Sequence, residues 1–138
     1  MFRDTDPKLI TERLLSAQEV MLADGPVAAY ASMLPGEPNR IKHLGAAFFT
    51  KFLYAVDQGA EGRPPALILD RFVVLALNDL LHWNLPVRTA CSADQYGRWL
   101  EAAACEAREA QNALGEPVRA DAVELAAFCH GKGSARMQ

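Results

Sequence analysis

The sequence lacks the features that identify several common classes of protein. Its three cysteines, Cys91, Cys105 and Cys129, form no CxxC pair and no cysteine–histidine spacing typical of a zinc or iron–sulfur site. No apolar run approaches the roughly 18 residues that cross a bilayer, and the first residues lack the apolar stretch of a signal peptide. We therefore expect a cytoplasmic protein with reduced cysteines, no metal, no cofactor and no membrane partner.

The chain also has no excess of basic residues. Its 14 lysines and arginines stand against 17 acidic residues, which gives a formal net charge of −3. Because nucleic-acid-binding domains usually carry a basic surplus, this balance argues against a general nucleic-acid binder. The 138 residues, of which 51% are hydrophobic, predict one domain with a single core rather than a disordered chain.

Almost every segment has a helical pattern, and the sequence predicts an all-α, compact helical domain. Asp6, Asp70 and Ser92 are candidate N-caps, and Gly115 follows the longest apolar pattern. The expected helices cover residues 7–23, 26–34, 37–44, 46–56, 71–81, 93–114 and 119–129.

The expected domain occupies residues 1–130 and is followed by a frayed polar tail over residues 131–138. Residues 57–65 form a loop by composition. Tyr96 and Trp99 lie within the longest helical pattern, where we expect core packing rather than stacking on bases.

The charges are unevenly distributed along the chain. Residues 38–56 contain no acid and three basic side chains, whereas residues 94–124 contain seven acids and three arginines. The acid-free stretch includes the turn expected at Gly45, and backbone N–H groups at the start of a helix attract phosphate. Chance in a mostly buried segment is the alternative explanation. The candidate nucleic-acid-binding residues are Arg40, Lys42, His43 and Gly45.

Two stretches of the chain resemble a known superfamily. Residues 41–53, IKHLGAAFFTKFL, and residues 67–73, LILDRFV, are similar to the helix-hairpin-helix (HhH-GPD) DNA glycosylases. They are more similar still to the bacterial proteins described as 8-oxoguanine DNA glycosylase-like. Residues 95–100, QYGRWL, and 121–128, DAVELAAF, also resemble these bacterial proteins. The resemblance thus extends over roughly residues 40–128.

The resemblance implies a shortened HhH-GPD fold with a helix-hairpin-helix element at about residues 38–56. In that superfamily a lysine nucleophile follows the hairpin, and an aspartate begins a later helix. Lys51 and Asp70, which are 19 positions apart, occupy these two places. The hairpin here has one glycine, Gly45, and no proline, in contrast to the usual Leu-Pro-Gly-hydrophobic-Gly pattern.

The activity implied by the resemblance is excision of an oxidised purine from double-stranded DNA, followed by an AP lyase step. The Lys51 amine would attack the anomeric carbon of a flipped nucleotide and form an imine with the opened sugar. Asp70 would stabilise positive charge at the sugar. The amine must be neutral to attack, and the aromatic residues around Lys51 would help to desolvate it.

Other interpretations stay open at the level of the sequence. Lys51 also fits an ordinary surface lysine, and Asp70 fits a plain helix cap. The altered hairpin favours a non-catalytic module that binds DNA or a protein. Relatives of the bacterial subfamily resemble components found among bacterial antiviral genes, and this likeness favours processing of a nucleobase or nucleotide. A short helical chain also leaves apolar surface that a homodimer or a partner protein would cover.

Overall fold

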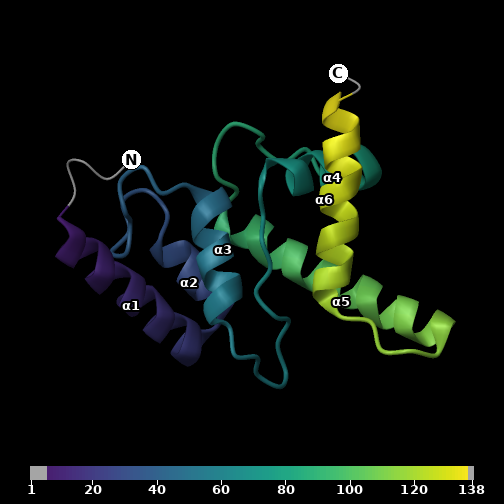
Figure 1. Ribbon diagram of the computed structural model, residues 1–138, viewed down its shortest axis with the longest axis horizontal. Helices are drawn as coiled ribbons and strands as arrows, with labels where there is room; N and C mark the ends of the chain where they lie inside the picture. Colours follow the sequence, from purple (N-terminus) through teal and green to yellow (C-terminus); the bar gives the residue numbers. More distant parts are fainter. Residues whose placement is uncertain (1–5, 137–138) are drawn as a thin grey trace.

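The computed structural model describes residues 6–136, and these residues form six α-helices and no strand (Figure 1). The helices are α1 (Pro7–Asp24), α2 (Pro26–Ser32), α3 (Ala46–Val56), α4 (Arg71–Leu81), α5 (Ala93–Leu114) and α6 (Ala120–Arg136). This confirms the all-α prediction. In the described part of the chain, no helix is both long enough and apolar enough to cross a membrane.

Local capping sets the helix boundaries where the sequence predicts them. The Asp70 carboxylate accepts a hydrogen bond from the Val73 N–H at 2.9 Å. The Ser92 hydroxyl accepts from the Gln95 N–H at 3.1 Å, and the Gln95 side chain accepts from the Ser92 N–H at 2.8 Å, which completes a capping box. Gly115 ends α5 in the left-handed conformation, with φ 72°. These contacts satisfy backbone groups that have no partner within the helix.

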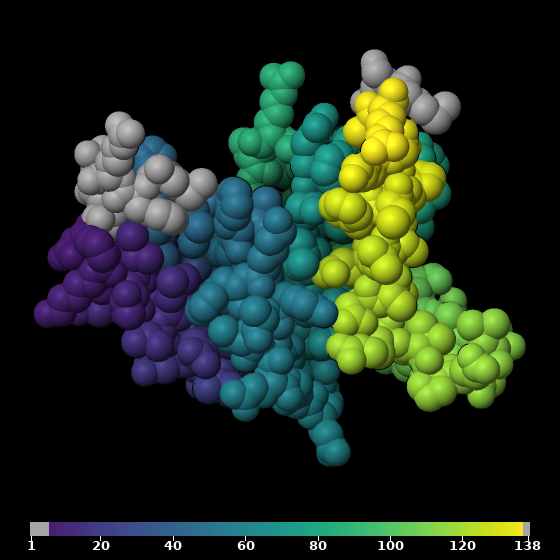
Figure 2. Space-filling view, viewed as in Figure 1, coloured from purple at the N-terminus to yellow at the C-terminus, as the bar shows by residue number. Residues whose placement is uncertain are grey.

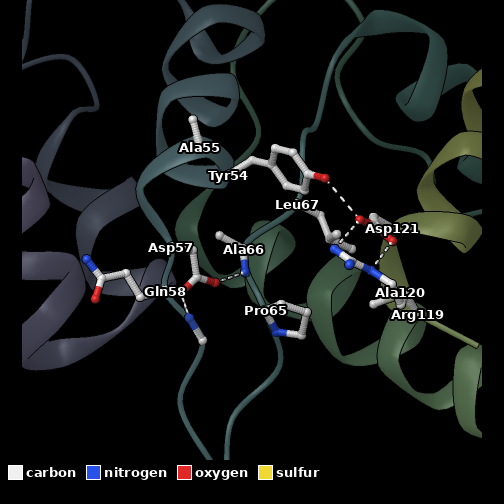
Figure 3. Close-up of a pocket in the computed structure, with 11 residues that line it drawn as sticks. Tyr54, Ala55, Asp57, Gln58, Pro65, Ala66, Leu67, Arg119, Ala120 and Asp121 are labelled. Carbon is white, nitrogen blue, oxygen red and sulfur yellow. Dashed lines mark hydrogen bonds and ion pairs between the residues drawn. The ribbon is translucent and has the colours of Figure 1, made fainter.

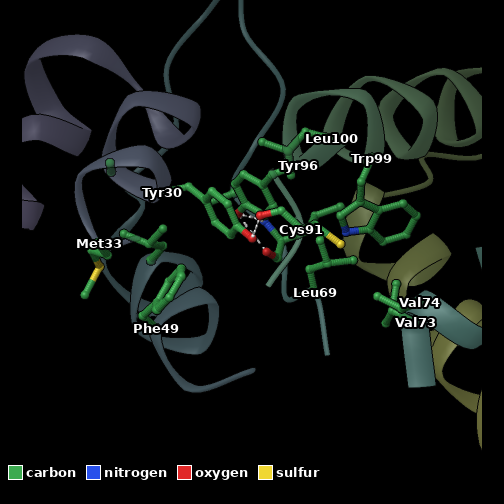
Figure 4. Packing of buried hydrophobic residues seen from close by; sticks show 14 of the residues in the cluster. Tyr30, Met33, Phe49, Leu69, Val73, Val74, Cys91, Tyr96, Trp99 and Leu100 are labelled. Carbon is green, nitrogen blue, oxygen red and sulfur yellow. Dashed lines mark hydrogen bonds between the residues drawn. The ribbon is translucent and has the colours of Figure 1, made fainter. Parts of the chain in front are cut away.

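The helices form two groups that meet at α5. In Figure 1, α1, α2 and α3 lie together on one side, and α4 and α6 lie on the other, with α5 reaching both groups. The core between them is aromatic (Figure 4). Tyr30 of α2 stacks on Tyr96 of α5 with ring centroids 4.3 Å apart and meets Phe49 of α3 edge-on at 5.1 Å. Tyr96 and Trp99 are 0% and 2% exposed, which confirms that they belong to the core.

The helix predicted over residues 37–44 is wrong. Residues 33–45 form turns, so α3 is the only one of the two expected hairpin helices that is present in the described structure. Pro38 lacks a backbone N–H and disfavours helical geometry at the residue before it. The buried Asn39 then holds the turns, because its N–H donates to the Ser32 carbonyl at 2.8 Å and its Nδ2 donates to Ser32 Oγ at 3.0 Å. The positive φ of 68° falls on His43, whereas Gly45 is extended with φ −80°.

The frayed tail predicted from residue 131 is also wrong as far as Arg136, because α6 continues to that residue. Residues 137–138 lie outside the described part. Gly131 is buried where α6 crosses α4, and a Cβ at Gly131 would lie 1.7 Å from the Phe72 carbonyl oxygen. The rings of Phe72 and Phe128 meet edge-to-face at 5.3 Å beside this crossing. The absence of a side chain at Gly131 therefore permits the close packing of the two helices.

Gly131 and Gly133 provide a matched test of this packing. We expect Gly131→Ala to lower the free energy of unfolding by about 1–3 kcal/mol, because the added methyl group overlaps the α4 backbone. Gly133→Ala should raise it by up to about 1 kcal/mol, since open space surrounds Gly133 and alanine favours a helix. Urea unfolding measures both changes. Equal stabilisation by the two substitutions would contradict the packing of α6 on α4.

Candidate active site

A buried extended segment, Ala66–Leu69, runs between the helices without a neighbouring strand. A buried backbone N–H without a partner is costly, so each of these residues needs an acceptor. Side chains supply all four acceptors. The first belongs to the C-cap of α3, and the other three belong to α5, α6 and α3, in that order. The N–H of Ala66 donates to Asp57 Oδ2 at 2.7 Å, that of Leu67 to the Tyr96 hydroxyl at 3.3 Å, that of Ile68 to Glu124 Oε1 at 2.5 Å and that of Leu69 to Thr50 Oγ1 at 3.1 Å.

The bond between Thr50 and Leu69 relates the two predicted catalytic residues. Thr50 is fully buried, and its hydroxyl also donates to the Ala46 carbonyl at 2.6 Å, which fixes the direction of its lone pairs. The next residue along α3 is Lys51, and the next residue after Leu69 is Asp70, the N-cap of α4. The hydrogen bond therefore holds the backbones that carry Lys51 and Asp70 next to each other.

Asp70 lines a cavity of about 440 Å³ between the start of α3, the start of α4 and the loop before α5. Ala47 and Phe48 of α3 also line it, and Lys51 lies one turn further along the same face of that helix. The Lys51 side chain is exposed, and its Nζ lies 5.6 Å from the centroid of the Phe48 ring. Within residues 6–136, Lys51 forms no ion pair.

Three arginines from three separate segments line the same cavity. Arg40 belongs to the turns before α3, Arg71 follows Asp70, and Arg88 belongs to the loop before α5. Asp70 is the one acidic residue among the described residues of the lining. Guanidinium groups bind phosphate oxygens well, so this arrangement suits a phosphate-bearing ligand.

The structure separates the predicted nucleic-acid-binding residues into two pairs. Arg40 and Gly45 line the cavity, whereas Lys42 and His43 are exposed in the turn outside its lining. Arg40 also supports that turn, because its Nη1 donates to the Leu44 carbonyl at 3.3 Å. The sequence analysis missed Arg71 and Arg88. Arg71 could have been noted from its place beside Asp70, but Arg88 lies in a loop without periodicity.

A second cavity, of about 550 Å³, lies further along α3 (Figure 3). Tyr54 and Ala55 line it, so Lys51 lies on α3 between the residues that line the two cavities. The Tyr54 hydroxyl donates to Asp121 Oδ2 at 2.9 Å, and the Asp121 carboxylate pairs with Arg119 at 2.8 Å. The hydrogen bond to the Asp121 carboxylate raises the pKa of Tyr54. Sequence analysis did not identify this group, because Tyr54 of α3 and Asp121 of α6 are 67 positions apart in the chain.

Within residues 6–136, no group of three or more histidine, cysteine, aspartate or glutamate side chains is arranged to bind a metal ion. The two cavities are lined instead by arginines, carboxylates, a tyrosine and apolar side chains.

Asp57 gives the extended segment its first anchor and a measurable pH dependence. Its side chain is 4% exposed and pairs with Arg63 at 2.7 Å, while the N–H groups of Gly59 and Ala66 also donate to it. Burial alone would raise the pKa of Asp57, but the hydrogen bonds from Arg63, Ala66 and Gly59 outweigh burial and lower it. A lowered pKa in the folded state stabilises the protein above the unfolded pKa, and this contribution is lost as the pH falls through the folded pKa.

We therefore expect Asp57→Asn to lower the free energy of unfolding at pH 7 by about 1–3 kcal/mol. The difference from the wild type should begin to shrink below about pH 4, where the carboxyl of the unfolded chain takes up a proton, and should shrink further as the pH falls through the lowered pKa of folded Asp57. Urea unfolding at pH 7, 5 and 3.5 measures this change. Glu61→Gln, in an exposed position of the same loop, is the control. A difference that does not depend on pH would exclude the charged pair as its cause.

Comparison with known proteins gives one family. The family described as "Putative 8-oxoguanine DNA glycosylase OGG-like protein" matches residues 2–128, which include Lys51, Asp70 and the linings of both cavities. No curated protein and no solved structure matches the chain significantly. Because the match covers most of the 138 residues, the chain belongs to the 8-oxoguanine DNA glycosylase OGG-like family.

Proposed function

We propose that this protein is a DNA glycosylase with AP lyase activity that removes an oxidised purine of the 8-oxoguanine class from double-stranded DNA. Lys51 is the nucleophile in this proposal, and Asp70 is its electrostatic partner. The observation that carries the proposal is the hydrogen bond from Leu69 to Thr50, which holds the backbones of the two residues together beside an arginine-lined cavity. Membership of the OGG-like family supports the choice of substrate.

The reaction begins when the neutral Lys51 amine attacks the anomeric carbon of a flipped nucleotide. The bond between this carbon and the base breaks, and the base leaves with the bonding electrons and takes up a proton. The sugar ring then opens as its oxygen leaves the same carbon, which yields an imine between Lys51 and the sugar. Loss of a proton from the adjacent sugar carbon expels the 3′ phosphate and cuts the strand.

The surroundings of Lys51 on α3 are consistent with this role. In the space-filling view, α3 lies at the middle of the visible face, between α1 and α6, so substrate can approach it (Figure 2). An ammonium group has no free electron pair, so Lys51 must lose a proton before it attacks. A nucleotide bound over the exposed side chain excludes water and favours the neutral amine. The Phe48 ring beside Nζ adds an apolar neighbour.

The place of Asp70 at the start of α4 suits the electrostatic role. Its Oδ1 accepts from the Val73 N–H, which fixes the carboxylate of this cavity-lining residue, and Oδ2 accepts no hydrogen bond within the described structure. A fixed negative charge stabilises the positive charge that develops at the sugar as the base leaves. The same residue thus caps the helix and serves the reaction.

Covalent trapping tests the nucleophile. With borohydride and duplex DNA containing 8-oxoguanine, the wild type should form a stable adduct, and Lys51→Gln should form none, because the amide cannot make an imine. Asp70→Asn keeps an oxygen for the helix cap but loses the charge, so we expect trapping to slow by about 100-fold or more. Lys8→Gln, on the exposed face of α1, is the control. Undiminished trapping by the Lys51 variant would refute the assignment.

A non-catalytic DNA-binding module is the second candidate function. The observation in its favour is that turns replace the first helix of the expected hairpin at residues 33–45. In this case the arginine-lined cavity binds DNA, but no lesion gives a covalent adduct.

The cavity arginines should contribute to DNA binding under either function. We expect Arg71→Gln and Arg88→Gln to weaken binding to duplex DNA and each to reduce the slope of log affinity against log salt by about 1. Arg108→Gln, on the exposed face of α5 away from this cavity, should leave the slope unchanged. Fluorescence anisotropy at several salt concentrations measures the slope. Equal slopes for the wild type and both cavity variants would show that DNA does not bind at the arginine-lined cavity.

A further inference from the structure

A carboxylate from α6 holds the peptide that leads into Asp70. Glu124 Oε1 accepts a hydrogen bond from the Ile68 N–H at 2.5 Å, two residues before Asp70. The Ile68 carbonyl accepts from Nε1 of Trp99 on α5 at 3.2 Å. Two helices therefore bind one residue of the extended segment, through its donor and through its acceptor.

The environment of Glu124 disfavours its negative charge. Burial raises the pKa of this half-buried carboxyl, the bond from the Ile68 N–H opposes the rise, and the charges of Asp121 and Asp70 add to it. Tyr54 of α3 and Tyr96 of α5 also lie within range of its charge. In the described residues no lysine or arginine pairs with Glu124. A half-buried carboxylate with two like charges nearby is a poor source of stability.

A neutral side chain could bind the same N–H without this penalty to the fold. Glutamine has the same length and also has an oxygen acceptor at Oε1. Glu124 therefore serves the site through the oxygen that accepts from the Ile68 N–H. This bond fixes the backbone next to Leu69, whose own N–H is bound by Thr50.

We propose that Glu124 is a positioning residue of the candidate active site, which holds the Ile68 peptide and thereby keeps the backbone of Asp70 next to that of Lys51. This inference rests on the proposed glycosylase function for its effect on rate, but not for its effect on the backbone. The acceptor oxygen of Glu124 carries the positioning, so an amide should replace the carboxylate and a hydrocarbon should not.

The test compares Glu124→Gln with Glu124→Leu, which has similar bulk and no acceptor. At saturating lesion DNA, we expect the leucine variant to be trapped about 10- to 100-fold more slowly than the wild type, because Asp70 is then misplaced relative to Lys51. The glutamine variant should retain most of the wild-type rate, and the affinity for DNA should stay within about twofold in both, since Glu124 lies outside the lining of the arginine cavity. Glu101→Leu, on the exposed face of α5, is the control for the change to leucine.

Amide hydrogen exchange gives a second readout that does not depend on activity. The N–H groups of Ile68 and Leu69 should lose protection in Glu124→Leu and keep it in Glu124→Gln, while the core of α5 stays protected in both. If the leucine variant does not fold, Glu124→Ala takes its place. Wild-type protection in the leucine or alanine variant, or equal loss in the glutamine variant, would overturn the inference. A wild type that traps no lesion refutes the proposed function alone, because the exchange pattern still decides the role of Glu124.

Discussion

Four backbone N–H groups in a buried extended segment need acceptors, and residues 6–136 include no strand that could supply them. The acceptors are side chains of Asp57, Tyr96, Glu124 and Thr50, so the helices that carry three of them must converge on the segment. An unpaired buried N–H costs about 1–3 kcal/mol, which makes each contact a condition on how the helices pack. The arrangement of α3, α5 and α6 around residues 66–69 follows from this requirement.

The need to bind these N–H groups also determines where the two candidate catalytic residues lie. Thr50 satisfies the Leu69 N–H and thereby relates α3 to the start of α4, where Lys51 and Asp70 lie. The charges are arranged around this point as well. Arginines from three segments line the cavity, while seven of the 17 acids lie within residues 94–124 and residues 38–56 contain none. A net charge of −3 is therefore compatible with a local surface that attracts phosphate.

Features that depend on neighbouring residues were predictable from the sequence. The caps at Asp70, Ser92 and Gly115 involve residues no more than four positions away, and the structure confirms them. The helix expected at residues 37–44 was wrong because Pro38 and the Asn39–Ser32 contacts favour turns over a weak apolar pattern. The expected end of the last helix was wrong because the polar composition of this segment hid the close packing of α6 on α4 at Gly131.

The candidate site likewise contains some residues that the sequence indicates and others that only the folded structure reveals. Lys51 and Asp70 were identified through the resemblance of residues 41–53 and 67–73 to the HhH-GPD glycosylases, and their catalytic roles stay a prediction. Thr50 and Glu124, which hold the backbone before Asp70, were not identified from the sequence. Thr50 bonds to a residue 19 positions away, and Glu124 bonds to one 56 positions away. Arg88 lies in a loop with no periodicity to reveal which way it faces. Contacts between distant segments form only once the helices pack, so a single sequence offers little sign of them.

The extended segment also bears on how the chain avoids aggregation. Residues 66–69, ALIL, form a short uncharged apolar stretch of the kind that pairs edge-to-edge with other chains when it is exposed. In the folded protein every N–H group of this stretch is already bound by a side chain, so no free row of donors is left for an incoming strand. The acceptors come from helices as late in the chain as α6, and the stretch is therefore fully protected only after the last helix has docked.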